Sequence, residues 1–143
     1  MKNQVTSIEQ SKRLIELGVP AEKSSMVWAP NYRFDSKIRQ FMHTGVYDLC
    51  MKHKAYTIIK EELIPAFTIA DMIDMLPITC GDLHIHIEEI TNGHKFIYYE
   101  GRKDIQDGNY TNLQTVLFVE NSLVESCVKA IEWVISNNYK LNI

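Results

Sequence analysis

The sequence contains few cysteines, glycines and prolines, so it does not have the composition of a disulfide-rich or glycine-rich small protein. Its 143 residues include only three cysteines, six glycines and four prolines. The cysteines, Cys50, Cys80 and Cys127, are widely separated and odd in number, so a disulfide framework is not expected. The few glycines also argue against a phosphate-binding loop, which exposes backbone amides at closely spaced glycines.

Long apolar runs and targeting signals are also missing. No run approaches the roughly 18 residues of a membrane-spanning helix, and residues 1–4 lack the apolar stretch of a signal peptide. We therefore expect a cytoplasmic protein that does not bind a membrane. A chain of this length buries roughly 68–70% of the surface that it exposes when unfolded. We predict one domain over residues 1–143, with no structural metal.

Common enzyme motifs are absent. The sequence has no G-x-S-x-G, no glycine-rich phosphate loop and no H-E-x-x-H. Asp71 and Asp74 have the spacing of a paired-carboxylate site, but we interpret Asp71 as a helix cap and Asp74 as solvated surface. These observations favour a protein without a cofactor and without catalytic activity.

Apolar residues recur at helical spacing in three segments, each of which follows a capping signal. The predicted helices cover residues 7–17, 69–76 and 123–137. Their capping pairs are Thr6 with Glu9, Thr68 with Asp71, and Ser122 with Glu125. Cys127 lies within the apolar stripe of the last segment, so we interpret it as a core residue.

The remaining apolar patterns are extended. Residues 25–34 are bent at Pro30 and predict an edge strand at best, since proline donates no backbone hydrogen bond. Strands are also predicted at residues 56–59, 83–88, 95–100 and 115–120, with a loop over residues 101–112. Residues 35–54 fit neither the helical nor the strand period, and both assignments stay open.

The segments 83–88 and 95–100 form a predicted hairpin around Asn92-Gly93. A two-residue turn sets Ile87 opposite Tyr98, whereas a three-residue turn sets Ile87 opposite Ile97. We prefer the second because it pairs apolar residues with apolar residues. Together these elements predict an α+β fold, in which two or three helices pack on one face of an antiparallel sheet.

Two histidines alternate on the first strand of this hairpin. His84 and His86 project from the same strand face, where two imidazoles can bind a divalent metal. Cys80, Asp82 or Glu88 is the candidate third ligand, although the spacing fixes none of them. A solvated strand face is the simpler interpretation and the one we favour.

Charge is distributed unevenly along the chain. Residues 1–60 hold ten Lys and Arg against five Asp and Glu, whereas residues 61–143 hold five against thirteen. The net charge of −3 is therefore the remainder of about +5 and −8. Cations interleave with aromatic residues within residues 31–60, a mixture that nucleic-acid surfaces use for phosphates and bases. The candidate nucleic-acid-binding residues are Arg33, Lys37, Arg39, Lys52 and Lys54. The simpler interpretation, which we favour, is that this basic stretch packs beside the acidic part of the same domain and neutralises it, because no helix-turn-helix, zinc or RNP-type motif accompanies the charge.

Three segments resemble a group of short uncharacterised proteins that are encoded on prophages and other mobile elements of gut anaerobic bacteria. Residues 6–21 (TSIEQSKRLIELGVPA) and the following Met-Val-Trp are similar to the opening of these proteins. Residues 64–77 (IPAFTIADMIDMLP) and 123–139 resemble their central and closing helices, with Phe67 and Ile69 where Trp and Leu are more usual. The resemblance implies a mobile-element origin and supports the helix boundaries; it assigns no activity, cofactor or catalytic residue to this chain.

The leading hypothesis is a non-catalytic binding or adaptor protein of a mobile element, with a protein or nucleic-acid partner. The alternative is a small metal-dependent enzyme centred on His84 and His86. A third hypothesis is a homodimer built on an exposed sheet edge or on the aromatic face of the hairpin.

Overall fold

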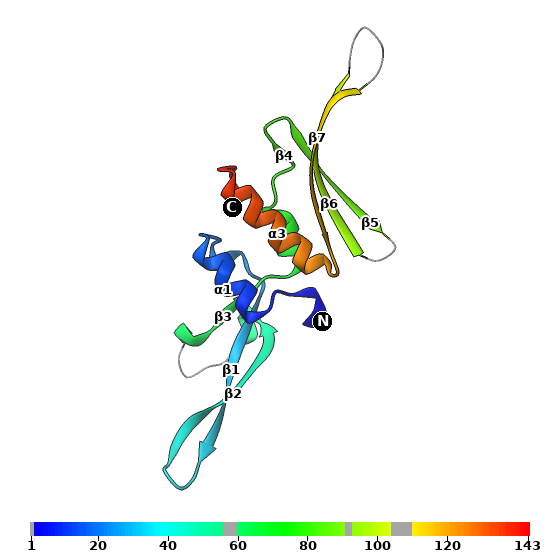
Figure 1. The fold of residues 1–143 in the computed structure, drawn as a ribbon. Helices are drawn as coiled ribbons and strands as arrows, with labels where there is room; N and C mark the ends of the chain where they lie inside the picture. The colour runs from blue at the N-terminus through cyan, green and yellow to red at the C-terminus, as the bar shows by residue number, and fades with distance from the viewer. Residues whose placement is uncertain (1, 56–59, 91–92, 104–109) are drawn as a thin grey trace. The chain divides into compact units, whose positions relative to one another are not determined.

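The computed structural model describes residues 2–55, 60–90, 93–103 and 110–143, as an α+β fold (Figure 1). Its helices are α1 (Ile8–Glu16), α2 (Ile69–Met75) and α3 (Leu123–Ser136). Its strands are β1 (Met26–Asp35), β2 (Gln40–Met51), β3 (Ile64–Ala66), β4 (Thr79–Cys80), β5 (Leu83–Ile90), β6 (Gly93–Lys103) and β7 (Tyr110–Glu120). The prediction of an α+β fold with antiparallel strands is confirmed, and the strands are divided between two sheets. No helix in these ranges is long and apolar enough to cross a membrane.

The chain divides into two compact units, Met1–Asp71 and Met72–Ile143. The boundary between them falls inside α2. Each unit contains one of the two sheets, in the orders β2-β1-β3 and β4-β5-β6-β7. That the whole chain folds as a single domain stays a prediction.

β1 is the central strand of the first sheet. The prediction of an edge strand is wrong for Met26–Trp28, which pairs with both β2 and β3. The pairing with β3 ends at Trp28, so within the described part of the sheet Pro30 has β2 as its one neighbour and needs no second ladder bond. The ambiguous segment 35–54 is now assigned, because β2 and a 3-10 turn, Lys52–Lys54, occupy most of it.

β1 and β2 form a hairpin, and the core of the first unit lies at its base, beside Met26–Trp28. Val5, Met26, Trp28 and Ala66 form a buried cluster. The Trp28 indole is orientated within it by a hydrogen bond from Nε1 to the Thr6 carbonyl oxygen at 3.0 Å. A buried indole N–H needs such a partner, so this contact fixes β1 against the N-terminal segment.

α1 begins with a capping box one residue later than predicted. Ser7 Oγ accepts from Gln10 N at 3.2 Å, and Gln10 Oε1 accepts from Ser7 N at 2.9 Å. Thr6, the predicted cap, is fully buried. Its Oγ1 lies 2.7 Å from Ser11 Oγ and accepts a hydrogen bond from Phe67 N at 3.0 Å. The prediction that Thr6 caps the helix is therefore wrong, because tertiary partners occupy its hydroxyl.

The other helix signals agree with the structure. Gly18, at φ 94°, follows the end of α1 in the left-handed conformation that glycine adopts without strain. Thr68 Oγ1 accepts from Asp71 N at 3.1 Å while Asp71 Oδ2 accepts from Thr68 N at 2.8 Å, which confirms the cap of α2. Ser122 Oγ accepts from Glu125 N at 3.1 Å at the start of α3.

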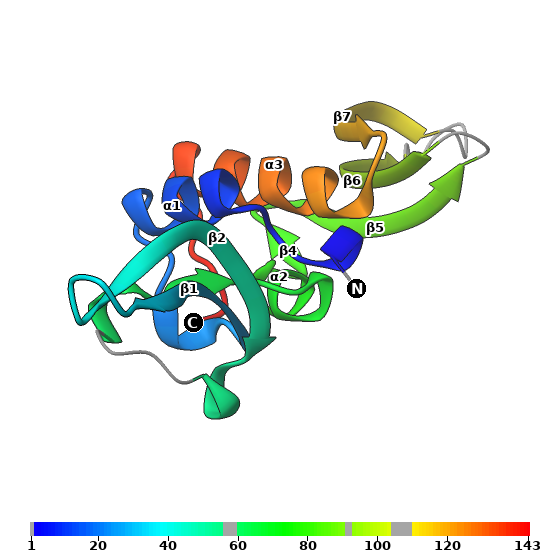
Figure 2. The same ribbon diagram turned by 90° about the horizontal axis from the view of Figure 1, so that it is seen from below.

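In the second unit, α3 lies against β6 and β7 (Figure 2). Trp133 of α3 meets Phe118 of β7 with ring centroids 6.2 Å apart. Cys127 is fully buried, and this burial raises the pKa of its thiol to about 12, as expected for a core residue. The C-terminal residues are held by Asn142, whose N and Nδ2 donate to the carbonyl oxygens of Met75 and Leu76 at 2.9 and 3.0 Å.

The register of β5 and β6 differs from both predicted registers. Ile87 lies opposite Phe96, one residue from the preferred pairing with Ile97. β6 also pairs with β7, where Phe96 lies opposite Phe118, so three strands share one register. The turn sequence alone could not determine this register. Residues 91–92 of the turn lie outside the described residues.

Two further predictions concern the connections. The predicted loop over residues 101–112 is wrong at its two ends, because β6 continues to Lys103 and β7 begins at Tyr110. The predicted strand at residues 56–59 lies outside the described residues.

Candidate functional site

The candidate site is the distal part of the β1–β2 hairpin, residues 31–47, which we call the arm. Among the strands that the structure describes, two form the arm, because β3 pairs with Met26–Trp28 alone. Figure 1 shows it extending away from α1 and β3 within the first unit. Its exposed large apolar side chains, each 50–60% accessible, are Phe34, Ile38, Phe41, Met42 and Val46. Two-stranded ribbons are marginally stable on their own, and this exposed apolar surface makes the arm the candidate interaction site.

One face of the arm carries a row of rings. The pairing sets Tyr32 opposite His43 and Phe34 opposite Phe41, so these four residues share one face. The ring centroids of Phe34 and Phe41 are 5.2 Å apart, and those of Tyr32 and His43 are 5.5 Å apart. Tyr47 extends the row towards the base, with its ring centroid 5.2 Å from that of His43.

The arm ends in a turn that presents cations. Asp35 Oδ1 accepts from the backbone N of Lys37 at 2.8 Å, which organises the turn. Arg39 has a φ of 52°, the left-handed conformation in which a side chain costs about 1 kcal/mol relative to glycine. Arg33 lies two residues before Asp35 on β1, so three of the five predicted cations are near the tip.

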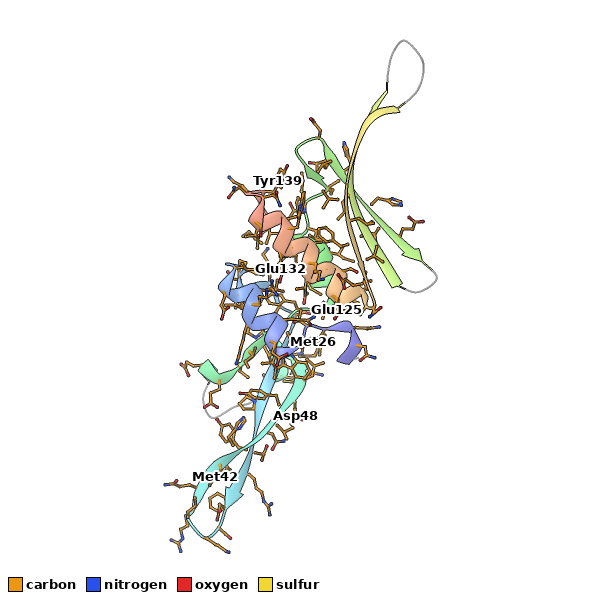
Figure 3. All side chains as sticks on the ribbon, in the orientation of Figure 1. Met26, Met42, Asp48, Glu125, Glu132 and Tyr139 are labelled. Carbon is orange, nitrogen blue, oxygen red and sulfur yellow. The ribbon has the colours of Figure 1, made fainter. Side chains whose placement is uncertain are left out.

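The arm bends at a bulge. The pairing shifts between Pro30 and Tyr32, and Gly45 has a φ of 81° on the opposite strand. Thr44 Oγ1 donates to the Asn31 carbonyl oxygen at 3.0 Å across the bulge. Bulges increase local strand twist. Residues 33–37 and 42–44 line a hollow of about 600 Å³ between this bulge and the tip. In Figure 3, the labelled Met42 lies towards the tip and Asp48 nearer the base.

The other two predicted cations lie at the base of the hairpin. Lys52 and Lys54 belong to the turn after β2, and Lys52 Nζ donates to the Ala21 carbonyl oxygen at 3.1 Å. At about 3.3 Å per residue, the nine steps from Met26 to Asp35 place the base about 30 Å from the tip. Lys54 nevertheless adjoins the arm, because it lines a second hollow of about 330 Å³ together with residues 29–32.

The charge asymmetry is local rather than a property of a whole unit. The first unit holds ten Lys and Arg against eight Asp and Glu, and the second holds five against ten. Residues 31–54 alone hold five against two. The excess positive charge of the first unit therefore coincides with the hairpin that bears the rings.

The predicted metal residues lie elsewhere. His84 and His86 are exposed on β5, opposite Tyr99 and Ile97 in the ladder. Cys80 is fully buried. Within the described ranges, no group of three His, Cys, Asp or Glu residues is placed to hold a metal ion. Among the described residues, no third ligand lies beside the pair, and the metal site stays a hypothesis.

The carboxylates Asp71 and Asp74 do not form a paired site. Asp71 Oδ2 accepts from Ser25 N at 3.0 Å and from Ser25 Oγ at 2.9 Å, in addition to its capping bond. Asp74 is exposed, as predicted. The role of Asp71 is structural, since it links α2 to the start of β1.

Sequence reasoning missed His43, which stands between two tyrosines in the ring row. Its role depends on the pairing of β1 with β2, and the ambiguous period of residues 35–54 concealed that pairing. The signal that could have revealed it is the recurrence of aromatic residues at alternate positions, 32 with 34 and 41 with 43.

The chain matches no protein-family model, no curated protein and no solved structure.

Proposed function

We propose that this chain is a non-catalytic, cytoplasmic accessory protein of a mobile element, and that its arm binds single-stranded nucleic acid. The observation that carries the proposal is the row of rings on one face of an exposed two-stranded ribbon, with cations at its tip. The mobile-element origin is supported by the resemblance of three sequence segments.

Base stacking is the first component of the proposed binding. Phe34 and Phe41 are at least half exposed, so each offers ring surface to a base. Stacking contributes about 1–3 kcal/mol per base and requires unpaired bases, which favours a single strand over a duplex. Because every base has a flat face, the proposed surface has little sequence preference.

Phosphate neutralisation is the second component. Arg33, Lys37 and Arg39 lie near the tip and are exposed. With about 0.7 counterions released per phosphate on a single strand, three contacts predict a roughly 20-fold loss of affinity between about 50 and 200 mM salt.

The decisive experiment is a fluorescence anisotropy titration of a labelled oligothymidine with the whole protein at these two salt concentrations. We expect salt-sensitive binding that Lys37→Glu/Arg39→Glu weakens at least tenfold. Lys12→Glu/Lys23→Glu makes the same charge change on exposed residues of the same unit outside the arm, and is the matched control. Lys52→Glu/Lys54→Glu is expected to have a smaller effect, because only Lys54 adjoins the arm.

Stacking is tested separately by Phe41→Ser. This change keeps the charge and removes an exposed ring, so affinity is expected to fall at both salt concentrations while the salt dependence is retained. Absence of binding at low salt, or equal losses in the arm variant and its control, contradicts the proposal. Capture of a protein by the arm through Phe34 and Phe41, without nucleic-acid binding, would assign the arm to a protein partner instead.

A further inference from the structure

β7 is the last strand of the second sheet, and its outer edge has no neighbour among the strands that the structure describes. Residues 114–120 pair continuously with β6, because the irregularity in that pairing lies further towards the start of the strand. This run, QTVLFVE, contains no Pro, Gly, Lys or Arg. Proteins block open edges with such residues or with bulges, so an unblocked edge is suited to pairing with another strand.

The only charge on this run is already neutralised within the chain. Glu120 Oε1 lies 2.6 Å from Lys129 Nζ of α3. A second copy can therefore approach the edge without facing a lone carboxylate. The edge of β2 differs, since Gly45 and the bulge interrupt its pairing with β1.

We propose that β7 pairs with β7 of a second copy, antiparallel across a two-fold axis at Leu117, to join the two sheets. The run 114–120 is symmetric about Leu117, so this register uses all seven residues of both strands. It sets Glu120 opposite Gln114 of the second copy, which is uncharged. It also sets Val116 opposite Phe118 of the second copy.

This register keeps like faces together. Phe118 contacts Trp133 of α3, so Val116, Phe118 and Glu120 lie on the strand face towards the helix, and Leu117 and Val119 lie on the opposite face. Leu117 and Val119 are 49% and 45% exposed on the face away from α3. The proposed register places odd-numbered positions opposite odd-numbered positions of the second copy, so this exposed apolar strip continues across the axis. A register shifted by one residue would instead join the strip to the helix-covered face of the second copy.

The interface is small. Seven paired residues at about 3.4 Å each, on a sheet about 10 Å thick, give a strip of about 240 Å² per copy, roughly a third of a standard interface. We therefore expect a weak dimer that forms in the micromolar range and dissociates on dilution.

Sedimentation equilibrium of the whole protein between about 5 and 500 µM, the range for a weak interface, tests association. The wild type is expected to shift from monomer to dimer. Leu117→Lys places two like charges at the axis and is expected to weaken association at least tenfold. Ile78→Lys changes a 72% exposed residue next to β4, at the opposite edge of the same sheet, and is the matched control. A protein that stays monomeric, or equal behaviour of both variants, overturns the proposal.

Disulfide trapping tests the register. In a Cys50→Ser background, Leu117→Cys is expected to crosslink on mild oxidation, because directly opposed residues have Cα atoms about 4.5–5.5 Å apart. Val119→Cys is expected to stay uncrosslinked, since residues 119 of the two copies are offset by four residues along the strands and lie about 14 Å apart in this register. Crosslinking of Val119→Cys but not of Leu117→Cys overturns the proposed register. Both readouts are independent of nucleic-acid binding by the arm.

Discussion

The buried hydroxyl of Thr6 permits a sharp test of how the first unit is held together. Thr6 uses every polar group it has, because its backbone N donates to the Phe67 carbonyl oxygen at 2.9 Å and its carbonyl oxygen accepts from Trp28. Its Oγ1 serves both Phe67 N and Ser11 Oγ. Thr6→Val preserves the shape and the backbone contacts while removing only the hydroxyl.

The expected cost follows from the partners that lose a bond. The Phe67 N–H stays buried without an acceptor, which costs about 1–3 kcal/mol. Ser11 loses its hydroxyl partner, which costs about 1 kcal/mol more. We therefore expect Thr6→Val to lower the free energy of unfolding by about 2–4 kcal/mol. Thr6→Ser keeps the hydroxyl and loses one methyl group, so its cost is about 1 kcal/mol.

Urea denaturation followed by tryptophan fluorescence measures these differences. Ser7→Ala, which removes the exposed helix cap, is the comparison and is expected to cost about 1 kcal/mol. Ser11→Ala combined with Thr6→Val is expected to cost less than the sum of the single changes, because both remove the same bond. If Thr6→Val lowers the free energy of unfolding by less than Ser7→Ala does, the buried hydroxyl of Thr6 does not hold the first unit together and the argument is refuted.

Four other outcomes are expected. Thiol labelling of the native protein modifies the half-buried Cys50 before Cys127, because the first is partly accessible and the second is fully buried. Burial raises the pKa of Cys127 from 9.0 to about 12, so stability is lost as pH rises above 9, where the unfolded thiol ionises, and Cys127→Ala reduces this slope in denaturation at several pH values. Fluorescence of Trp28 in the first unit and Trp133 in the second, each measured with the other replaced by Phe, reports one shared unfolding midpoint, since the boundary between the units falls inside a helix, α2; separated midpoints would indicate two domains. Zinc is expected to leave the melting temperatures of the wild type and of His84→Ala/His86→Ala unchanged. Stabilisation by zinc of the wild type but not of the variant would support the metal-enzyme hypothesis.

Helices were predictable because their signals are local. The reciprocal bonds of Thr68 and Asp71, and the cap at Ser122, involve residues three apart in the chain. Such contacts form within one turn, so their residue types are readable without knowledge of the fold. The wrong assignment at Thr6 shows the limit of local signals. Thr6 and Ser7 both have side chains that can cap a helix, and only the tertiary contacts of Thr6 determine that Ser7 is the cap.

Strand arrangement was less predictable because it depends on distant partners. The register of β5 with β6 is shared with β7, and the central position of β1 depends on β3. Two of the candidate cations, Lys52 and Lys54, are separated from the other three by the length of a hairpin whose existence the period of residues 35–54 did not reveal.

By itself, the sequence determined the fold class, the ends of most helices and the uneven charge, because these depend on residue type and short-range spacing. Only the tertiary structure decided that His43 joins a row of rings, that the arm has two strands, and that the run of residues 114–120 lies at an open edge. Each of these properties arises from pairing between strands, and the same side-chain alternation is compatible with several pairings until the whole sheet is assembled.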